Sequence, residues 1–366
     1  LLIPILYDKN WVQKNIEDQL LNNFNINFSL SSDISYRILP SPHYFVKDSK
    51  IFKKNNKTVS LAEIKNLKIF VSQKNFFDKK KLILKDVKIN NADFTLSTND
   101  IRILKNSTNN KFSNKKIEIN KSNIFFKNDL NEVVSIIKIS SSFLLQDKKN
   151  FLNIFKLKGK IFNVPFNIDY SRKLDFSKSE KINIIAKTLK LNMSNTFHLV
   201  ENDNSKGKNI ISFLNSRINT NYKIENGAII FNSVNSRIMN NNLDYSGELS
   251  IDPFNLNLNI DLDSYDLHKA LNNDSILNEL IKTKLLFNNN ISMNTAITTN
   301  VNLKNKIFQN AVIYFNIIHG KLNINKTKLI NNKIGILELE NSDLSYEKDR
   351  LILNTDIVVN IKNSDE

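Results

Sequence analysis

The chain has 366 residues, of which 41% are hydrophobic, so it can bury a core and is too apolar for a disordered polypeptide. It contains no cysteine, which excludes disulfides, thiolate metal ligands and cysteine nucleophiles. With six glycines and five prolines it also lacks the composition of collagen, of glycine-rich β-helices and of glycine phosphate loops.

The net charge is strongly positive at +16, from 52 Lys and Arg against 36 Asp and Glu. A basic surface attracts nucleic acid, anionic lipid headgroups or acidic polysaccharide. The lysines are spread along the chain, however, with no basic cluster beyond short runs such as 79–81. Asn, Lys and Ile, which have AT-rich codons, are abundant throughout, so we attribute the charge first to coding bias.

The chain opens with the apolar segment Leu1–Tyr7, which fits either a first β-strand or the end of a membrane anchor that precedes it. No apolar run reaches the ~20 residues of a transmembrane helix. Asp8 suits a helix N-cap, and the apolar residues after it share one helical face. These residues are Trp11, Val12, Ile16, Leu20 and Phe24. The pattern predicts a helix over 9–23.

Two strands are predicted next, at Asn27–Leu39 and Tyr44–Phe52, because apolar residues alternate along both. The motif Leu39-Pro40-Ser41-Pro42 joins them. Proline fixes φ and lacks an N–H donor, so two prolines this close stop ladder pairing and predict a corner between the strands.

Short strand-like runs separated by polar residues fill the rest of the first half. They are Ile64–Val71, Leu82–Ile89, Phe94–Leu96, Ile117–Ile119, Ile124–Phe126, Val133–Ile139 and Ile182–Met193. The segment 105–116 is a predicted polar loop. Between 151 and 168 the alternation places Phe155, Leu157 and Ile161 on one face and lysines on the other.

A polar stretch at 201–209, ENDNSKGKN, is the predicted linker between two β regions, 1–200 and 210–366. In the second region FNLNLNIDL has the clearest alternation of the chain. Its apolar face consists of Phe254, Leu256, Leu258, Ile260 and Leu262. A helical pair is predicted near 265–287, and strands resume from Ile291 to Ile361.

More than a dozen strands with few helices pose a packing problem, because open twisted sheets rarely exceed ~10 strands without curling, splitting or closing. Their apolar face must be covered by a barrel, by a second sheet or by a hydrophobic ligand in a groove.

The order of the pieces resembles the AsmA family of bacterial envelope proteins. At the N-terminus the matching residues are Ile3-Pro4, Asp8, Ile16-Glu17, Leu39-Pro40-x-Pro42 and Val46-x-Asp48-x-x-Ile51. Where the family has a glycine after the helix, Leu21–Ile26 reads LNNFNI, and Asn also tolerates positive φ. The strand GELSID at 247–252, followed by a predicted helix at Tyr265–Leu271, is similar to the family's C-terminal half.

This resemblance implies a long, curved, largely antiparallel sheet with an apolar groove. It further implies a single N-terminal inner-membrane anchor, a periplasmic bulk, and a role in outer-membrane assembly or phospholipid transport between membranes, related to the bridge-like lipid-transfer proteins. The candidate groove face then comprises the eight apolar residues named above at 155, 157, 161, 254, 256, 258, 260 and 262.

Nothing in the sequence predicts catalysis, a metal or a cofactor. His43, His198, His268 and His319 stand apart in the sequence without metal-ligand spacing, and we expect His43 and His319 in turns or on the surface. Nucleophile elbows, phosphate loops and dinucleotide motifs are missing.

Two other classes of protein stay open. A secreted β-repeat adhesin would show similar Asn- and Ser-rich alternation, although β-helices need tight turns and a fixed period. A basic nucleic-acid-binding protein would need clustered Lys and Arg with exposed aromatic residues, and the aromatic residues here are mostly Phe.

Overall fold

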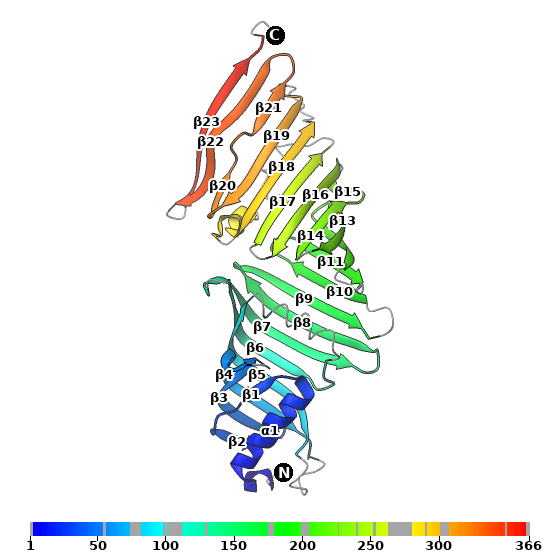
Figure 1. Ribbon diagram of the computed structural model, residues 1–366, viewed down its shortest axis with the longest axis vertical. Helices are drawn as coiled ribbons and strands as arrows, with labels where there is room; N and C mark the ends of the chain where they lie inside the picture. Colours follow the sequence, from blue (N-terminus) through cyan, green and yellow to red (C-terminus); the bar gives the residue numbers. More distant parts are fainter. Residues whose placement is uncertain are drawn as a thin grey trace. The chain divides into compact units, whose positions relative to one another are not determined.

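The computed structural model of the chain is mainly β (Figure 1). It describes residues 3–53, 56–73, 82–97, 100, 112–128, 131–174, 179–198, 205–225, 227–238, 241–251, 254–262, 280–289, 291–300, 307–347 and 350–363. Within these ranges 23 strands belong to one long mixed sheet, and helices are few. The predicted mainly β fold is confirmed.

Two compact units make up the chain. The N-terminal unit comprises Leu1–Ile161 and Pro165–Lys178, and the C-terminal unit comprises Phe162–Val164 and Ser179–Glu366. The linker predicted at 201–209 does not separate them, because strand β12 begins at Lys206 and pairs on both sides. Ladder hydrogen bonds join backbone groups and need no apolar side chain, so a polar stretch of sequence forms a strand here.

The first elements are a helix and a series of long strands. In chain order they are η1 (Ile3–Leu6), α1 (Lys9–Phe24), β1 (Asn27–Ser29), β2 (Ile34–Arg37), β3 (His43–Lys53), β4 (Asn56–Val71), β5 (Leu84–Ser97), β6 (Ile117–Lys127), β7 (Val133–Asp147), β8 (Leu152–Ile161) and β9 (Val164–Lys173). Consecutive strands from β3 to β8 pair antiparallel, except that β5 and β6 run parallel. A parallel pair needs a connection that returns along the strand. Of the loop predicted at 105–116 in this connection, 105–111 lie outside the described residues.

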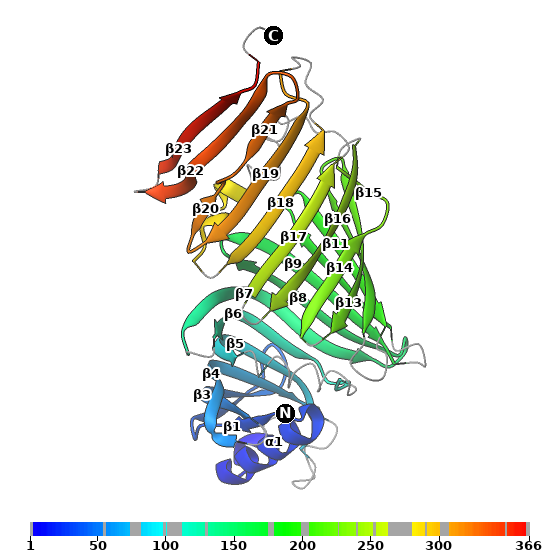
Figure 2. The ribbon, with the colours of Figure 1, turned by 45° about the horizontal axis from the view of Figure 1, so that its top comes forward.

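Strands dominate the C-terminal unit as well (Figure 2). They are β10 (Ser179–Ala186), β11 (Leu191–His198), β12 (Lys206–Phe213), β13 (Ser216–Glu225), β14 (Ala228–Ser233), β15 (Ser236–Ile238), β16 (Asn241–Ile251), β17 (Phe254–Leu262), β18 (Ser292–Asn300), β19 (Asn310–Ile318), β20 (Lys321–Asn323), β21 (Lys328–Asn331), β22 (Gly335–Glu347) and β23 (Arg350–Ile361). Strands β17 and β18 run parallel. The predicted helical pair near 265–287 falls in their connection: 263–279 lie outside the described residues, 280–282 are helical, and η3 (Leu285–Phe287) is a short 3-10 helix.

Helix α1 is capped at both ends, as its sequence predicts. The Asp8 carboxylate accepts a hydrogen bond from the Trp11 backbone N–H at 2.8 Å. Asn25 ends the helix in the left-handed conformation at φ 58°, the role that a glycine often plays. Glu17 and Gln19 accept backbone hydrogen bonds from Leu30 and Leu84, both at 2.8 Å, and so fasten the helix to the strands.

The main core of the N-terminal unit lies between α1 and the strands. Val12, Ile16 and Leu20 are the buried face of the helix. They pack in one cluster with strand residues that include Leu67 and Ile89, both nearly inaccessible. Burial of such side chains contributes roughly 1.5–3 kcal/mol each, so this cluster fixes the helix on the sheet.

Left-handed residues bend the long strands of this unit without ending them. Asp48 in β3, Asn91 in β5 and Lys121 in β6 have φ values of 50°, 54° and 49° and occupy one row across the sheet. The small buried residues Ser49, Ala92 and Ser122 follow them. Each kink inverts the alternation of inward and outward side chains. The two runs predicted at Leu82–Ile89 and Phe94–Leu96 are therefore one strand, β5.

The proline corner connects β2 to β3. Leu39 is 81% exposed at its tip. The strand predicted at Asn27–Leu39 is divided into β1 and β2, which both pair antiparallel with β3.

His43, which we expected in a turn or on the surface, is instead buried at the start of β3. Its Nδ1 lies 2.7 Å from the Ser41 carbonyl oxygen, and its ring packs against Phe70. Burial lowers the pKa of this imidazole.

Candidate functional site

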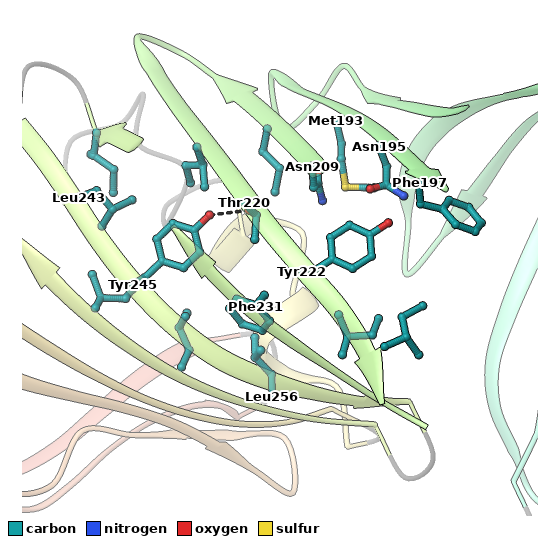
Figure 3. A pocket seen from close by; sticks show the side chains of 17 residues that line it. Met193, Asn195, Phe197, Asn209, Thr220, Tyr222, Phe231, Leu243, Tyr245 and Leu256 are labelled. Carbon is teal, nitrogen blue, oxygen red and sulfur yellow. Dashed lines mark hydrogen bonds between the residues drawn. The ribbon is translucent and has the colours of Figure 1, made fainter. Parts of the chain in front are cut away.

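An apolar pocket of about 490 Å³ lies on one face of strands β11 to β17 in the C-terminal unit (Figure 3). Its walls are the side chains of Met193, Asn195, Phe197, Asn209, Ile211, Ile218, Thr220, Tyr222, Ile224, Ile229, Phe231, Ile238, Leu243, Tyr245, Leu256, Leu258 and Ile260. None of these residues carries a charge.

Strand alternation explains how so many apolar side chains reach one face. The strand register places Met193 opposite Ile211 and Ile211 opposite Ile218, so that every second residue of each strand points to the pocket. The residues between them point away and, apart from Ile210 and Ile230, are polar. On β17, Asn257 and Asn259 are exposed on the other face.

Two glycines make room for aromatic rings in the pocket wall. Gly207 lies directly opposite Tyr222, and a Cβ at Gly207 would approach the Tyr222 hydroxyl oxygen to 2.3 Å. Gly247 lies opposite Phe231, and a Cβ there would approach the Phe231 ring to 2.6 Å. The rings cover the glycine backbones, and any larger residue would displace them.

A row of polar side chains crosses the otherwise apolar wall. Asn195 lies opposite Asn209, and Asn209 lies opposite Thr220. The hydroxyls of Thr220 and Tyr245 form a hydrogen bond of 2.5 Å (Figure 3), and Tyr245 also donates to the Asn219 carbonyl oxygen at 3.2 Å.

Both tyrosines of the wall are half-buried. Burial raises the pKa of the Tyr222 and Tyr245 phenols. Hydrogen bonds with the side chains of Asn195 and Thr220, respectively, act in the opposite direction. Both phenols are consequently neutral hydrogen-bonding groups at physiological pH.

The described residues of the C-terminal unit leave the pocket wall partly open to solvent. The larger apolar residues of the wall are mostly half-buried, and none belongs to the three buried core clusters that the described residues form. Leu243, at 2% exposure, is fully buried at the pocket's edge. The arrangement is a concave apolar surface with a few polar groups, which is typical of a ligand site.

The sequence-based candidates divide between the two units. Leu256, Leu258 and Ile260 line the pocket. On the same strand Phe254 is 43% exposed and Leu262 is buried, and neither lines the pocket.

The other groove candidates, Phe155, Leu157 and Ile161, lie on β8 in the N-terminal unit and are not among the residues that line the pocket. The corner residues Leu39, Pro40 and Pro42 are in that unit too.

Sequence reasoning missed the polar row and the rings. None of Asn195, Asn209, Thr220 and Tyr222 was named as a candidate from the sequence. The sequence does contain a signal for two of them: Thr220 and Tyr222 occupy the even-numbered positions between Ile218 and Ile224, and therefore share their face of the strand.

The pocket is lined by uncharged side chains. Its wall has no nucleophile paired with a base, and no group of His, Asp and Glu among the described residues could hold a metal ion. His198 is at the end of β11 and His319 is exposed in the turn after β19, whereas His268 lies outside the described residues.

Comparisons with known proteins do not assign the chain. A scan against protein-family models finds no match, and no curated protein matches the sequence. Of the helices that the structure describes, none is long and apolar enough to cross a membrane.

Proposed function

We propose that the chain holds the acyl chains of phospholipid in the pocket of β11 to β17, as the periplasmic part of an AsmA-like protein anchored in the inner membrane. Its role is then outer-membrane assembly or phospholipid transport between membranes. The observation that carries this proposal is the uncovered apolar face.

The energetics favour an apolar ligand. Each CH₂ that leaves water contributes about 0.8 kcal/mol, and the volume of about 490 Å³ falls in the ~300–1,000 Å³ range of small-molecule sites. The wall offers no charged partner for a headgroup, so the headgroup would stay in water. Holding is passive and needs no enzyme or cofactor.

The cellular location rests on the sequence resemblance. The pieces from Ile3-Pro4 to Ile51 resemble the region that follows the inner-membrane anchor in the AsmA family. A C-terminal reporter on the full-length protein should therefore be active on the periplasmic side. Activity only in the cytoplasm would contradict this location.

The test of lipid holding uses Leu258→Asp, whose carboxylate would enter the pocket. Acyl chains beside it would desolvate the charge at a cost of several kcal/mol. We expect wild-type protein purified from bacteria to carry phospholipid, measured by mass spectrometry, and the variant to carry several-fold less. Without lipid the pocket is open to water, so the variant should melt as delipidated wild type does.

Asn259→Asp is the matched control, because it adds the same charge on the opposite, exposed face of β17. It should keep both its lipid and its melting temperature. A wild type free of lipid, or a Leu258→Asp protein that loses its fold before its lipid, would contradict the proposed function.

A further inference from the structure

The polar row of the pocket contains two amide groups with unfilled hydrogen-bonding capacity. Asn195 and Asn209 lie directly opposite each other on β11 and β12. The Oδ1 atoms of both are buried and have no hydrogen-bond partner. Thr220 and Tyr245, farther along the same row, satisfy each other. The unfilled capacity is therefore concentrated at one end of the row.

Buried amide groups are almost always paired in folded proteins, because an unpaired one loses its water without replacement. Leucine at either position would remove that penalty and extend the apolar wall. A function in the bound state explains two unpaired amide oxygens in this wall, where the asparagines interrupt a surface that consists, apart from Thr220, of Met, Ile, Leu and aromatic residues.

The surroundings define the chemistry of the group that would pair with them. The wall contains no charged residue, and the nearest lysines of these strands, Lys208 and Lys223, are exposed on the other face. An ionised carboxylate or phosphate would thus be left uncompensated. A side-chain amide both donates and accepts hydrogen bonds, and a half-turn about its Cβ–Cγ bond exchanges the two. A neutral hydroxyl, which also donates and accepts, complements it fully.

We propose that the pocket prefers acyl chains that carry a hydroxyl group, which Asn195 and Asn209 bind within the apolar wall. The Tyr222 hydroxyl, which lies beside Asn195 in the same wall (Figure 3), completes this polar subsite. The inference rests on the proposed function, since it names which acyl chains the same pocket selects.

The experiment compares myristic acid with its derivatives hydroxylated near the carboxyl end or at mid-chain, as competitors of a fluorescent fatty acid on delipidated protein. We expect at least one hydroxylated derivative to bind wild type about five- to tenfold more tightly than myristic acid, the effect of a net hydrogen bond or two. The double variant Asn195→Leu/Asn209→Leu should bind myristic acid at least as well and lose the preference.

Asn192→Leu/Asn221→Leu is the matched control, because both asparagines are exposed on the opposite face of β11 and β13. This control should keep the preference. The pocket double variant should also melt at a higher temperature than wild type without ligand, which confirms that it is folded; if it does not fold, the two single variants serve in its place.

The outcomes separate the two proposals. Equal binding of all the fatty acids by wild type, or a preference that survives in the pocket double variant, would overturn the hydroxyl subsite and leave acyl-chain holding intact. Failure of wild type to bind any of these fatty acids would overturn both.

Discussion

The sheet beneath α1 and the sheet face that forms the pocket are built by the same alternation of apolar and polar residues, but among the described elements only the first is packed under a helix. Under α1, residues such as Ile16 and Leu67 are fully buried. In the pocket, equally large residues such as Leu256 and Leu258 are half-buried. Antiparallel sheets expose one face readily only when that face is polar. Under our proposal, acyl chains cover the apolar face of the C-terminal unit where α1 covers the core of the N-terminal unit.

The same leucine truncation in both places should give the largest difference. Leu20→Ala opens a cavity in a closed core and should lower the free energy of unfolding by about 2–5 kcal/mol. Leu256→Ala removes atoms from an open wall, leaves no closed cavity, and should cost less than about 1.5 kcal/mol. Urea unfolding followed by circular dichroism measures both. Equal losses would show that the pocket face is packed like a core.

Gly207→Ala should separate stability from ligand capacity. The new methyl group would collide with the ring end of Tyr222, which can swing into the open pocket, so the loss of stability should stay within about 1 kcal/mol. The displaced ring would then occupy ligand space and reduce bound phospholipid. Gly159→Ala is the contrast, because its Cβ would approach the backbone carbonyl oxygen of Lys138 to 2.6 Å, and this should destabilise the fold of the N-terminal unit.

Alkaline pH should produce the smallest effect. Burial raises the pKa of the Tyr44 phenol above its ordinary value of 10.0, and the charges of Tyr7 and Tyr36 act in the same direction. Because the folded state keeps a proton that the unfolded state loses, the stabilising contribution is complete below pH ~10 and declines above it, by at most about 1.4 kcal/mol per pH unit. Tyr44→Phe should flatten this decline between pH ~9 and ~11 in urea unfolding. Tyr222→Phe, in the half-buried wall, should change it less, and the reverse order would contradict the difference in cover.

The fold was predictable in segments whose apolar residues repeat with a single helical or strand period. The cap at Asp8 and the apolar face to Phe24 define α1, and the alternation of FNLNLNIDL defines β17. The ends of the strands were predicted less well, because backbone ladder hydrogen bonds allow a strand to continue through polar residues. Strand β12 thus starts inside the predicted linker, and β5 continues through the kink at Asn91.

The site was only partly predictable. Leu256, Leu258 and Ile260 were correctly placed on one face, but alternation alone does not reveal what covers that face. The same alternation placed Leu157 on the candidate groove face, although this residue is buried in the N-terminal unit. The polar row was missed because Asn195 and Asn209 belong to the pocket only through strand register, which no local pattern encodes.

The absence of cysteine from the chain permits the most direct test of the claim that lipid, and not protein, covers the pocket face. Single cysteines would be placed in the pocket (Leu258→Cys), on the opposite face of β17 (Asn259→Cys) and in the closed core (Leu67→Cys), and their rates of thiol labelling measured in folded protein. Our account predicts that, after delipidation, the pocket cysteine reacts nearly as fast as the cysteine at 259. Added phospholipid should slow only the pocket cysteine. The core cysteine should react only when the protein unfolds. A pocket cysteine as unreactive as the core cysteine in delipidated, folded protein would contradict it.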